Sequence, residues 1–455
     1  MVVSASLAAQ CRGLSRNAPC PCASGRRFKL CCGAPNVASL VSGQVETSKL
    51  AGLAAQQRFE FAEAVAHYEI ALRHDPLDFD AAHMRAVALY QMGCMRESLE
   101  AFLEMLGAGL PMSAVAWHNL GLTVAQGVQL ADDPALLEKT VAYQSWSAER
   151  REASPDFSPT VAVVVASYNH IRYIGAALES VLGQTRLPDE LIVIDDGSSD
   201  GSADYIREVL RNAPFPTQVI ARENRGAAAT FNEAIALAKS DWIAPLNSDD
   251  RFAPERIERL IAACCRTGID WGFGRVNVVD ATGQPSDTAP DTLAHSLRGV
   301  ANTGYMSPTT GIAFLLANPA ISTGNIFFRK TLWQQVGGFR DWRYNHDWHF
   351  ALQACLCSEP IRVAAALYDY RIHESNTISE NNDAVKAECA AMRGQALAQI
   401  AAFDVAAGGN PFAPCPAVWR RAFYSIIGGI GCLELLPELA LRSLAAELSE
   451  VPRLC

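Results

Sequence analysis

The sequence lacks several features, and each absence excludes a class of protein. It has no stretch of about 18 uninterrupted apolar residues, so no membrane-spanning helix is predicted. It has no basic excess, with 38 Lys and Arg against 48 Asp and Glu, and the net charge of −10 argues against non-specific binding to nucleic acid. Residues 1–10 have neither a basic start nor a long apolar core, so no secretory signal is predicted. We therefore expect a cytoplasmic protein, with at most peripheral membrane contact.

A disulfide pattern is also missing. Most of the fourteen cysteines occupy unpatterned positions such as Cys264 and Cys355, as free buried thiols in a reducing compartment do. Half of the residues are hydrophobic and 19% are charged, which is the composition of folded domains. The length of 455 residues allows two or three domains.

Four cysteines near the amino terminus form an exception. They follow the pattern C-x-C-x8-C-C and are Cys20, Cys22, Cys31 and Cys32. Four thiolates at this spacing suit one tetrahedral Zn²⁺ ion; the alternative is a coincidental set of free thiols. Residues 15–36 resemble the SEC-C zinc motif, except that Ala23 stands where that family usually has Gly. In that family the motif is a docking module, so the resemblance implies a protein partner.

Residues 46–150 show helical periodicity and an internal repeat. Tyr68 and Ala71 recur as Phe102 and Met105, 34 residues later, which is the period of tetratricopeptide (TPR) repeats. The block resembles two and a half to three TPR units, whose groove typically receives a peptide. The alternative is a helical spacer that only covers the next domain.

The segment 158–380 alternates buried strands with helices. Strands are predicted near residues 161–167, 191–195, 218–221 and 240–247, with helices at 171–183 and 202–212 between them. This order predicts an α/β domain with a parallel, doubly wound sheet. In such sheets ligands bind at the carboxyl ends of the strands. Asp195 and Asp196 lie at one such end, and a nucleobase N–H or a ribose hydroxyl would offset the cost of burying them.

Two further features follow in the same segment. Residues 223–232 are rich in Gly and Ala at a predicted helix start, where free N–H groups favour an anion. The strand near 240–247 ends in Asn247, Asp249 and Asp250, and clustered oxygen ligands suit a divalent cation that also holds a diphosphate. An ordinary helix cap or surface turn is the alternative for each feature taken singly.

In this order, the motifs of residues 160–378 resemble those of the family 2 glycosyltransferases, which have the GT-A fold. The resemblance implies transfer of a sugar from a nucleoside-diphosphate-sugar donor to a hydroxyl group of a glycan or protein acceptor. It implies nucleotide-sugar binding by Ser167, Asn169, Asp196, Ser198, Asn224, Asn232 and Asn247. Asp196 would bind the base, and Asp249 would ligate Mg²⁺ or Mn²⁺.

The resemblance also implies catalytic residues in the second half of this segment. His346-Asp347 matches an acidic pair at a helix start, and the second acid of that pair is the general base of an inverting transfer. Asp347 is therefore the predicted catalytic residue. Residues 370–376 match a closing Y-R-x-H-x-x-N segment, which makes His373 the second ligand of the cation. A helix-start carboxylate stabilised by the helix dipole and a structural histidine are the alternatives.

Three positions depart from the family pattern. Asn247 replaces the first acid of the D-x-D motif, Phe231 replaces an arginine, and His346 replaces an acid. These departures favour a rival function, an adaptor that binds partners through the zinc motif and the helical groove and has a degenerate GT-A domain. A nucleotidyltransferase would need a Gly-rich loop with Arg and Lys after the first strand, and residues 167–170 do not supply one.

Residues 384–455 are rich in Ala and Leu and predict a helical extension. The Gly-rich stretch Ile426–Gly431 within it is too short to span a bilayer. The sequence thus predicts four parts: 15–36, 46–150, 158–380 and 384–455. It leaves open the sugar, the base, the acceptor, the oligomeric state and whether the last helices touch a membrane.

Overall fold

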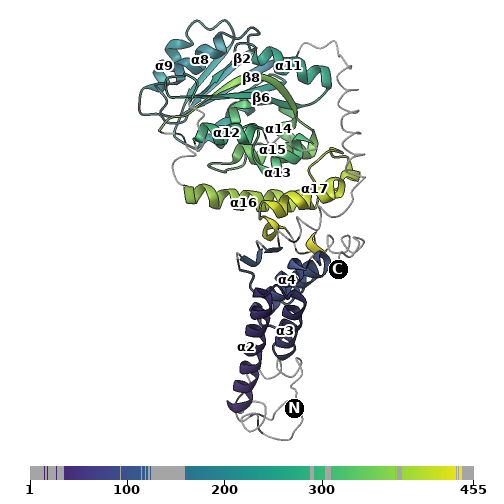
Figure 1. Ribbon diagram of the computed structural model, residues 1–455. Coiled ribbons are helices and arrows are strands. Elements are labelled where there is room, and N and C mark those ends of the chain that lie inside the picture. Colours follow the sequence, from purple (N-terminus) through teal and green to yellow (C-terminus); the bar gives the residue numbers. More distant parts are fainter. Residues whose placement is uncertain are drawn as a thin grey trace. The chain divides into compact units, whose positions relative to one another are not determined.

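The protein is described here by a computed structural model (Figure 1). It describes residues 15, 18, 27, 35–92, 94–113, 115–117, 119–120, 123, 159–286, 292–302, 309–374, 376, 382–436, 438 and 440–442. The chain divides into two compact units, one of residues 1–132 with 424–455 and one of residues 133–423. The four predicted zinc ligands, Cys20, Cys22, Cys31 and Cys32, lie outside the described residues.

The first unit contains a block of successive helices. They are α2 (Pro35–Gln57), α3 (Phe61–His74), α4 (Phe79–Gln91) and α5 (Met95–Gly107). Each helix packs against the next one along the chain (Figure 1). The start of α4 shows why these residues form a helix there, because the side chain of Asp78 accepts a hydrogen bond from the N–H of Ala81 at 2.8 Å. Such a cap satisfies a donor that the first turn leaves free.

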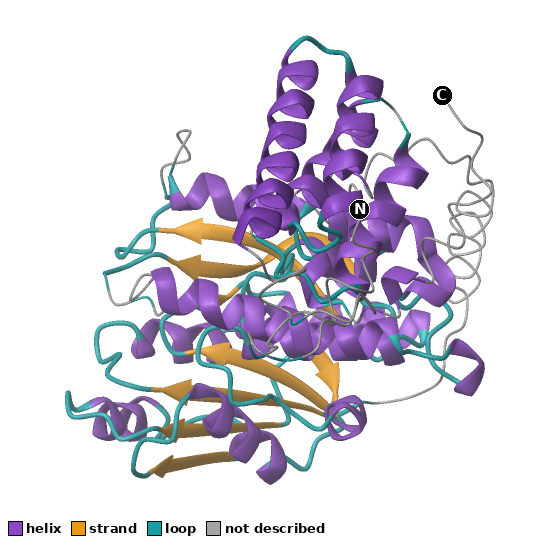
Figure 2. Ribbon diagram, turned by 90° about the horizontal axis from the view of Figure 1, so that it is seen from below, coloured by secondary structure: helices purple, strands orange, loops and turns teal. Residues whose placement is uncertain are grey.

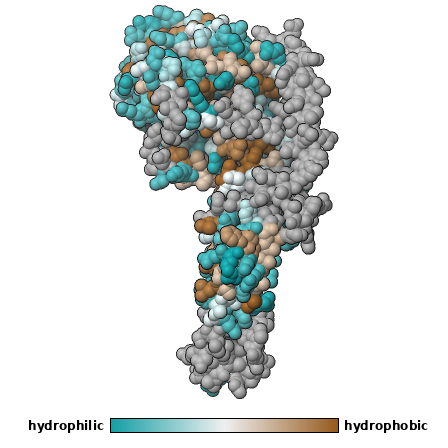
Figure 3. Space-filling view, viewed as in Figure 1, coloured by the Kyte–Doolittle hydropathy of each residue, from teal (hydrophilic) through white to brown (hydrophobic). Residues whose placement is uncertain are grey.

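The positions that repeat in the sequence are buried in this block. They are Ala64, Tyr68 and Ala71 of α3, and Ser98, Phe102 and Met105 of α5. The hydroxyl of Tyr68 donates to Gln56 Oε1 at 2.9 Å and so ties α3 to α2. On the visible surface of these helices, apolar side chains are scattered among polar ones (Figure 3). The TPR-like character of the block stays a prediction.

The second unit is built on one eight-stranded sheet. Its strands are β1 (Val161–Ser167), β2 (Glu190–Asp195), β3 (Thr217–Ala221), β4 (Trp242–Asn247), β5 (Arg251–Phe252), β6 (Trp271–Val279), β7 (Ile326–Arg329) and β8 (Ile361–Arg371). Their order across the sheet is β3-β2-β1-β4-β7-β6-β8-β5. The α/β class predicted from the sequence is confirmed by this arrangement.

Helices lie against both faces of the sheet (Figure 2). The α-helices of this part of the chain are α8 (Ile174–Leu182), α9 (Ser202–Val209), α10 (Ala227–Leu237), α11 (Arg256–Thr267), α12 (Leu293–Asn302), α13 (Thr310–Leu316), α14 (Lys330–Val336), α15 (His346–Cys357), α16 (Asn382–Ala401) and α17 (Pro416–Gly429). Short 3-10 turns occur at η3 (Thr323–Asn325), η5 (Val405–Ala407) and η6 (Leu433–Leu435). None of the described helices combines the length and the apolar run needed to cross a membrane.

The sheet is mixed, whereas the sequence predicts a parallel one. Strands β3, β2, β1 and β4 are parallel neighbours, as predicted, but β7 runs antiparallel to both β4 and β6. The reason lies in how the chain enters β7. Ser322, just before β7, accepts a hydrogen bond from Asn247 at the end of β4. The chain therefore joins the sheet at the edge where β4 leaves it, and β7 has to run the opposite way.

The core of this unit explains why the apolar runs form strands. Every residue of β1 except Ala166 is buried, because β1 lies between two strands and under helices. Trp242 of β4 and Phe327 of β7 stack with ring centroids 5.3 Å apart. The buried guanidinium of Arg256 donates to Asn325 Oδ1 and to the carbonyl of Gly324, both at 2.9 Å. These bonds hold η3 in place, and η3 belongs to the segment that faces the carboxyl ends of the strands.

Candidate active site

Several of the predicted site residues lie at one edge of the sheet, where the parallel strands β1, β2 and β4 end. Ser167 of β1 lies level with Asp195 of β2, and Ala166 lies level with Asn247 of β4. Ser167 Oγ and Asp195 Oδ2 are buried without a hydrogen-bond partner in the described part of the chain. Because buried polar atoms are rarely left unsatisfied, this pair marks a place for a ligand. The sequence predicts a ligand beside Asp195 and Asp196 together, and the family resemblance assigns only Asp196 to the base.

Two loops at this edge are tied to each other. Asn169 has a φ of 52°, in the left-handed region that Asn tolerates better than most residues. Its N–H donates to Ser198 Oγ at 2.8 Å, and its Oδ1 accepts from the N–H of Ser199 at 2.9 Å. Gly197 has a φ of +84°, and a Cβ there would lie 2.9 Å from the backbone nitrogen of Asn224. Asn169, Ser198 and Asn224, three of the predicted donor-site residues, are thus brought together.

The carboxylate of Asp196 holds the next loop. It accepts hydrogen bonds from the N–H groups of Arg225 and Gly226, each at 2.9 Å, and its Oδ1 also accepts one from the guanidinium of Arg222. These bonds fix the amino end of α10 beside β2. A carboxylate oxygen accepts two hydrogen bonds, so Oδ2 of Asp196 keeps a position for a ligand N–H. Its predicted role in base recognition stays a prediction.

Three potential metal ligands converge at the same edge. They are His170 after β1, Asp249 after β4 and His373 after β8, and their ligand atoms all lie within 4.8 Å of one another. His373 Nε2 and Asp249 Oδ2 are 3.0 Å apart. The sequence predicts Asp249 and His373 as a pair, and the structure brings them together across 124 positions of the chain. His170 is an addition that sequence reasoning missed.

The surroundings of His373 fix its orientation. The backbone N–H of His373 donates to Asn376 Oδ1 at 2.6 Å, and the side-chain amide of Asn376 donates to the carbonyl of Arg371 at 3.1 Å. The ring of Tyr173 lies against the imidazole, with centroids 4.6 Å apart. The two hydrogen bonds hold the turn that carries His373, and the ring contact restricts the imidazole itself. Asn376, a member of the predicted closing segment, therefore has a positioning role.

The protonation states of the cluster suit a cation. Burial acts to raise the pKa of Asp249, but the hydrogen bond from His373 and the proximity of His170 outweigh it, and the pKa lies below its ordinary value. Burial lowers the pKa of His170. An ionised carboxylate and a neutral imidazole are the forms that bind metal ions. At neutral pH this part of the site is therefore ready for a divalent cation.

Asp250 and Asn247 have different environments from Asp249. Burial, and then the neighbouring Asp249, raise the pKa of Asp250 well above its ordinary value. Asp250 accepts hydrogen bonds from the Tyr368 hydroxyl at 2.6 Å and from the N–H of Arg371 at 2.8 Å, so it anchors β8. The amide nitrogen of Asn247 donates to Ser322, and its Oδ1 has no donor among the described residues. That oxygen is the part of Asn247 available to a ligand.

Asp347 lies in the first turn of α15 and is 8% exposed. Its Oδ2 accepts from the side-chain amide of Asn318 at 3.1 Å, and its Oδ1 accepts from the N–H of Trp348 at 2.7 Å. Burial raises its pKa, although His346 and these hydrogen bonds act in the opposite direction. A carboxylate with a raised pKa is a better proton acceptor than an exposed one, as a general base requires.

Tyr370 of β8 has several carboxylates around it. Burial raises the pKa of the Tyr370 phenol, and the carboxylates of Asp250, Asp249 and Asp347 raise it further. That Asp347 and the predicted metal ligands belong to one site stays a prediction.

Asn232 is placed differently from the other predicted donor-site residues. Its Oδ1 accepts from Trp333 Nε1 at 3.0 Å and from the N–H of Phe339 at 2.9 Å, and its Nδ2 donates to the carbonyl of Phe339 at 2.7 Å. The amide thus clamps α10 to the segment after α14. The neighbouring Phe231 is buried against Phe339, with ring centroids 6.1 Å apart. A structural role accounts for both residues, and the predicted donor contact of Asn232 stays a prediction.

Comparison with known proteins bears on this unit. Residues 162–305 match the family model described as "Glycosyl transferase family 2". This segment is similar to a glycosyl transferase family 2 domain. The match includes His170 and Asp249 and ends before Asp347 and His373. The GT-A type of α/β fold expected for this family agrees with the sheet and helices described above. Residues 16–34 match the SEC-C motif, so that resemblance is also confirmed.

Similar proteins include several glycosyltransferases. An uncharacterized glycosyltransferase of Nostoc sp. is 28% identical over 161 residues, which are 34% of this chain and 50% of that protein. The succinoglycan biosynthesis protein ExoO of Rhizobium meliloti is 32% identical over 177 residues, which are 35% of this chain and 50% of that protein. The chain thus spans about half the length of these curated relatives.

Two solved structures are also similar to parts of this chain. Staphylococcus aureus TarS 1-349 in complex with UDP is 18% identical with a TM-score of 0.40, over 55% of this chain and 68% of that one. The mannosyltransferase PcManGT from Pyrobaculum calidifontis, in complex with GDP-Man and Mn²⁺, is 16% identical with a TM-score of 0.40, over 73% of this chain and 87% of that one.

Proposed function

We propose that this protein is an inverting, metal-dependent glycosyltransferase that moves a sugar from a nucleoside-diphosphate-sugar donor to a hydroxyl group of a glycan or protein acceptor. One observation carries the proposal. His170, Asp249 and His373 come from three distant parts of the chain and bring their ligand atoms within 4.8 Å of one another. They lie at the sheet edge that also holds Asp196, inside and beside a family 2 domain.

The residues present fit a divalent cation. Asp249 supplies a carboxylate oxygen, and His170 and His373 supply imidazole nitrogens. Two nitrogen ligands favour Mn²⁺ over Mg²⁺, because Mg²⁺ prefers a shell made only of oxygen. A cation held here would supply charge neutralisation for the departing diphosphate.

In the proposed reaction Asp347 is the general base. Its carboxylate takes the proton of the acceptor hydroxyl while that oxygen forms a bond to the anomeric carbon of the donor sugar. The bond between the anomeric carbon and the diphosphate oxygen breaks, and the nucleoside diphosphate leaves. Attack from the face opposite the leaving group inverts the configuration. Asn318 holds the carboxylate in place through the bond to Oδ2.

The rival function, an adaptor with a degenerate GT-A domain, rests on Asn247, Phe231 and His346. Each of these side chains has a defined place in the fold. Asn247 keeps an oxygen available, and Phe231 packs on Phe339. His346 lies within hydrogen-bond distance of Thr323 Oγ1 at 2.9 Å and of the Trp342 carbonyl at 3.1 Å. These departures are therefore compatible with an intact site.

The first test is calorimetry with UDP and Mn²⁺ on the full-length protein. We expect binding that requires the cation and that is lost in Asp249→Ala. Asp204→Ala is the matched control, because its side chain is 93% exposed on α9, and it should bind UDP as the unmodified protein does. Metal-dependent UDP binding that survives Asp249→Ala would refute the role of this residue. Release of UDP from a UDP-sugar without acceptor would exclude the adaptor function.

A further inference from the structure

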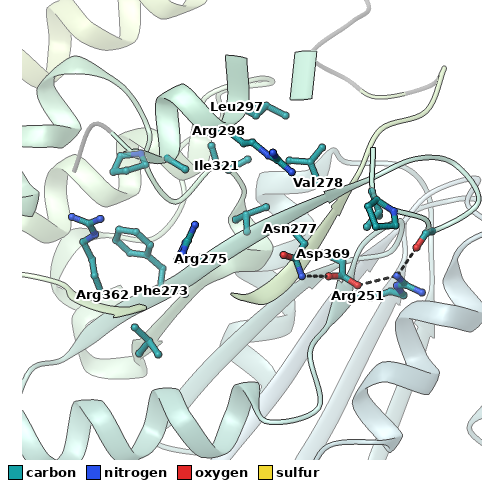
Figure 4. A pocket seen from close by; sticks show the side chains of 18 residues that line it. Arg251, Phe273, Arg275, Asn277, Val278, Leu297, Arg298, Ile321, Arg362 and Asp369 are labelled. Carbon is teal, nitrogen blue, oxygen red and sulfur yellow. Dashed lines mark hydrogen bonds and ion pairs between the residues drawn. The ribbon is translucent and has the colours of Figure 1, made fainter. Parts of the chain in front are cut away.

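A cavity lies along β6 and β8, with a volume of ≈ 560 Å³ (Figure 4). Its walls come from β6, from both ends of β8, from α12 and from residues 319 and 321. Apolar side chains such as Phe273, Leu297 and Ile321 form part of the lining. A cavity of several hundred cubic ångströms holds a ligand of one or two sugar rings.

The lining of this cavity is strongly cationic. Four arginines and one carboxylate contribute to it: Arg251, Arg275, Arg298, Arg362 and Asp369. The carboxylate is already engaged, since Arg251 donates to Asp369 Oδ2 at 2.9 Å and Asn277 donates to its Oδ1 at 3.1 Å (Figure 4). The guanidinium groups of Arg275 and Arg298 meet no carboxylate among the described residues. Like charges around one cavity attract an anion.

The cavity shares a wall with the candidate active site. Pro319 and Ile321 line the cavity, whereas the flanking Asn318 donates to the proposed base Asp347 and Ser322 accepts from Asn247. Ile321 has a φ of 71°, a conformation that costs energy for a β-branched residue. The segment 318–322 therefore contains a strained residue and contacts both the cavity and the candidate active site.

The loop after β4 makes a second link. Asp249 belongs to the metal-ligand cluster, Asp250 is buried beneath it, and Arg251 lines the cavity. Three consecutive residues therefore run from the proposed donor site to the cationic cavity. A molecule held in the cavity would lie next to the place where the sugar is transferred.

We propose that this cavity is the acceptor subsite and that the acceptor is an anionic glycan, whose phosphate or carboxylate groups bind Arg275 and Arg298. The planar guanidinium group matches both anions through paired hydrogen bonds. The apolar part of the lining would contact the faces of the sugar rings. This inference rests on the proposed glycosyltransferase function and adds the chemical class of its acceptor.

The test measures binding of three oligosaccharide probes to the full-length protein without donor or metal. The probes are a neutral glucan oligosaccharide, a glucuronate-containing oligosaccharide and a glycerol phosphate oligomer. We expect at least one anionic probe to bind about tenfold more tightly than the neutral one or better, with an affinity that falls as salt is added. The two anionic probes together distinguish carboxylate from phosphate recognition.

Variants then locate the binding. Arg275→Ala combined with Arg298→Ala should weaken binding of the preferred anionic probe about tenfold or more, with an unchanged circular dichroism spectrum. Arg211→Ala, an exposed arginine after α9, is the matched control and should not change binding. Equal binding of neutral and anionic probes, or full binding by the double variant, would overturn the inference. UDP binding by the unmodified protein is measured in parallel, so that failure of the glycosyltransferase function itself is recognised separately.

Discussion

At the scale of single residues, the site depends on side chains whose environment sets their chemistry. Asp249 and Asp250 are adjacent in the chain, yet the pKa of Asp249 is lowered by its histidine neighbours and that of Asp250 is raised by burial. The first is therefore suited to bind a cation and the second to anchor β8. Sequence motifs alone treat these two acids as alike.

His170 provides the first prediction at this scale. Replacing it by Ala removes one of three converging ligands, so we expect Mn²⁺ affinity to fall by at least about tenfold, as measured by calorimetry or by the water proton relaxation of bound Mn²⁺. His295→Ala, an exposed histidine on α12, serves as the control. Unchanged Mn²⁺ affinity in His170→Ala would show that His170 only packs beside the cluster.

Asp347 provides the second prediction. Asp347→Asn should keep UDP binding but lower turnover by about 10²- to 10⁴-fold, because the amide cannot accept the proton. Burial raises the pKa of Asp347. As the pH falls, its carboxylate is therefore protonated at a higher pH than an ordinary aspartate, and the base is lost. The acid limb of kcat/KM in the unmodified protein should therefore lie at a higher pH than that at which an ordinary aspartate titrates. A variant with normal turnover would remove Asp347 from the mechanism.

At the scale of elements, the parallel strands β1, β2 and β4 create the site by ending at the same edge of the sheet. The segments that complete it come from the second half of the domain. They are η3, α15 and the end of β8, and buried contacts such as those of Arg256 hold η3 in place. The helix α10 is held at two points, by Asp196 at its start and by Asn232 in its middle.

Asn232 provides a prediction at the scale of elements. Asn232→Ala leaves Trp333 Nε1 and the N–H of Phe339 without their acceptor, so we expect the free energy of unfolding to fall by about 1–3 kcal/mol in urea denaturation. Asn212→Ala, an exposed residue after α9, should change it little. The affinity for UDP should change little, whereas the free energy of unfolding should fall by the amount given above. Weakened UDP binding at unchanged stability would instead favour the donor contact that the family resemblance implies.

At the scale of the whole molecule, the chain joins a segment that matches the glycosyl transferase family 2 model to a helical block and a SEC-C motif. The association of these parts suggests that the amino-terminal unit recruits the acceptor or a protein partner. The boundaries of the four predicted parts stay predictions. The division into two compact units splits the predicted extension 384–455, because residues 424–455 group with the amino-terminal unit and residues 384–423 with the other unit.

The SEC-C motif provides the prediction for the whole molecule. In the full-length chain, Cys20→Ser with Cys22→Ser should abolish bound Zn²⁺ in elemental analysis, because two of four thiolates are removed. We expect donor hydrolysis to be unchanged and transfer to the native acceptor to fall. Cys265→Ser, a free cysteine on α11, is the control and should retain Zn²⁺. Normal transfer by the zinc-free variant would end the recruitment role.

The sequence by itself determined the class of the fold, since apolar runs followed by polar residues fix both the strands and the edge where they end. Asp249, His373 and Asp347 are predicted from local motifs that resemble those of the family 2 glycosyltransferases, and the structure brings Asp249 and His373 together. Only the tertiary structure decided what depends on contacts between distant segments. It reversed the direction of β7, added His170 to the metal-ligand cluster, gave Asn232 a structural clamp, and gathered four arginines around one cavity. No local sequence pattern predicts any of these four features, because each arises where parts of the chain far apart in sequence are packed against one another.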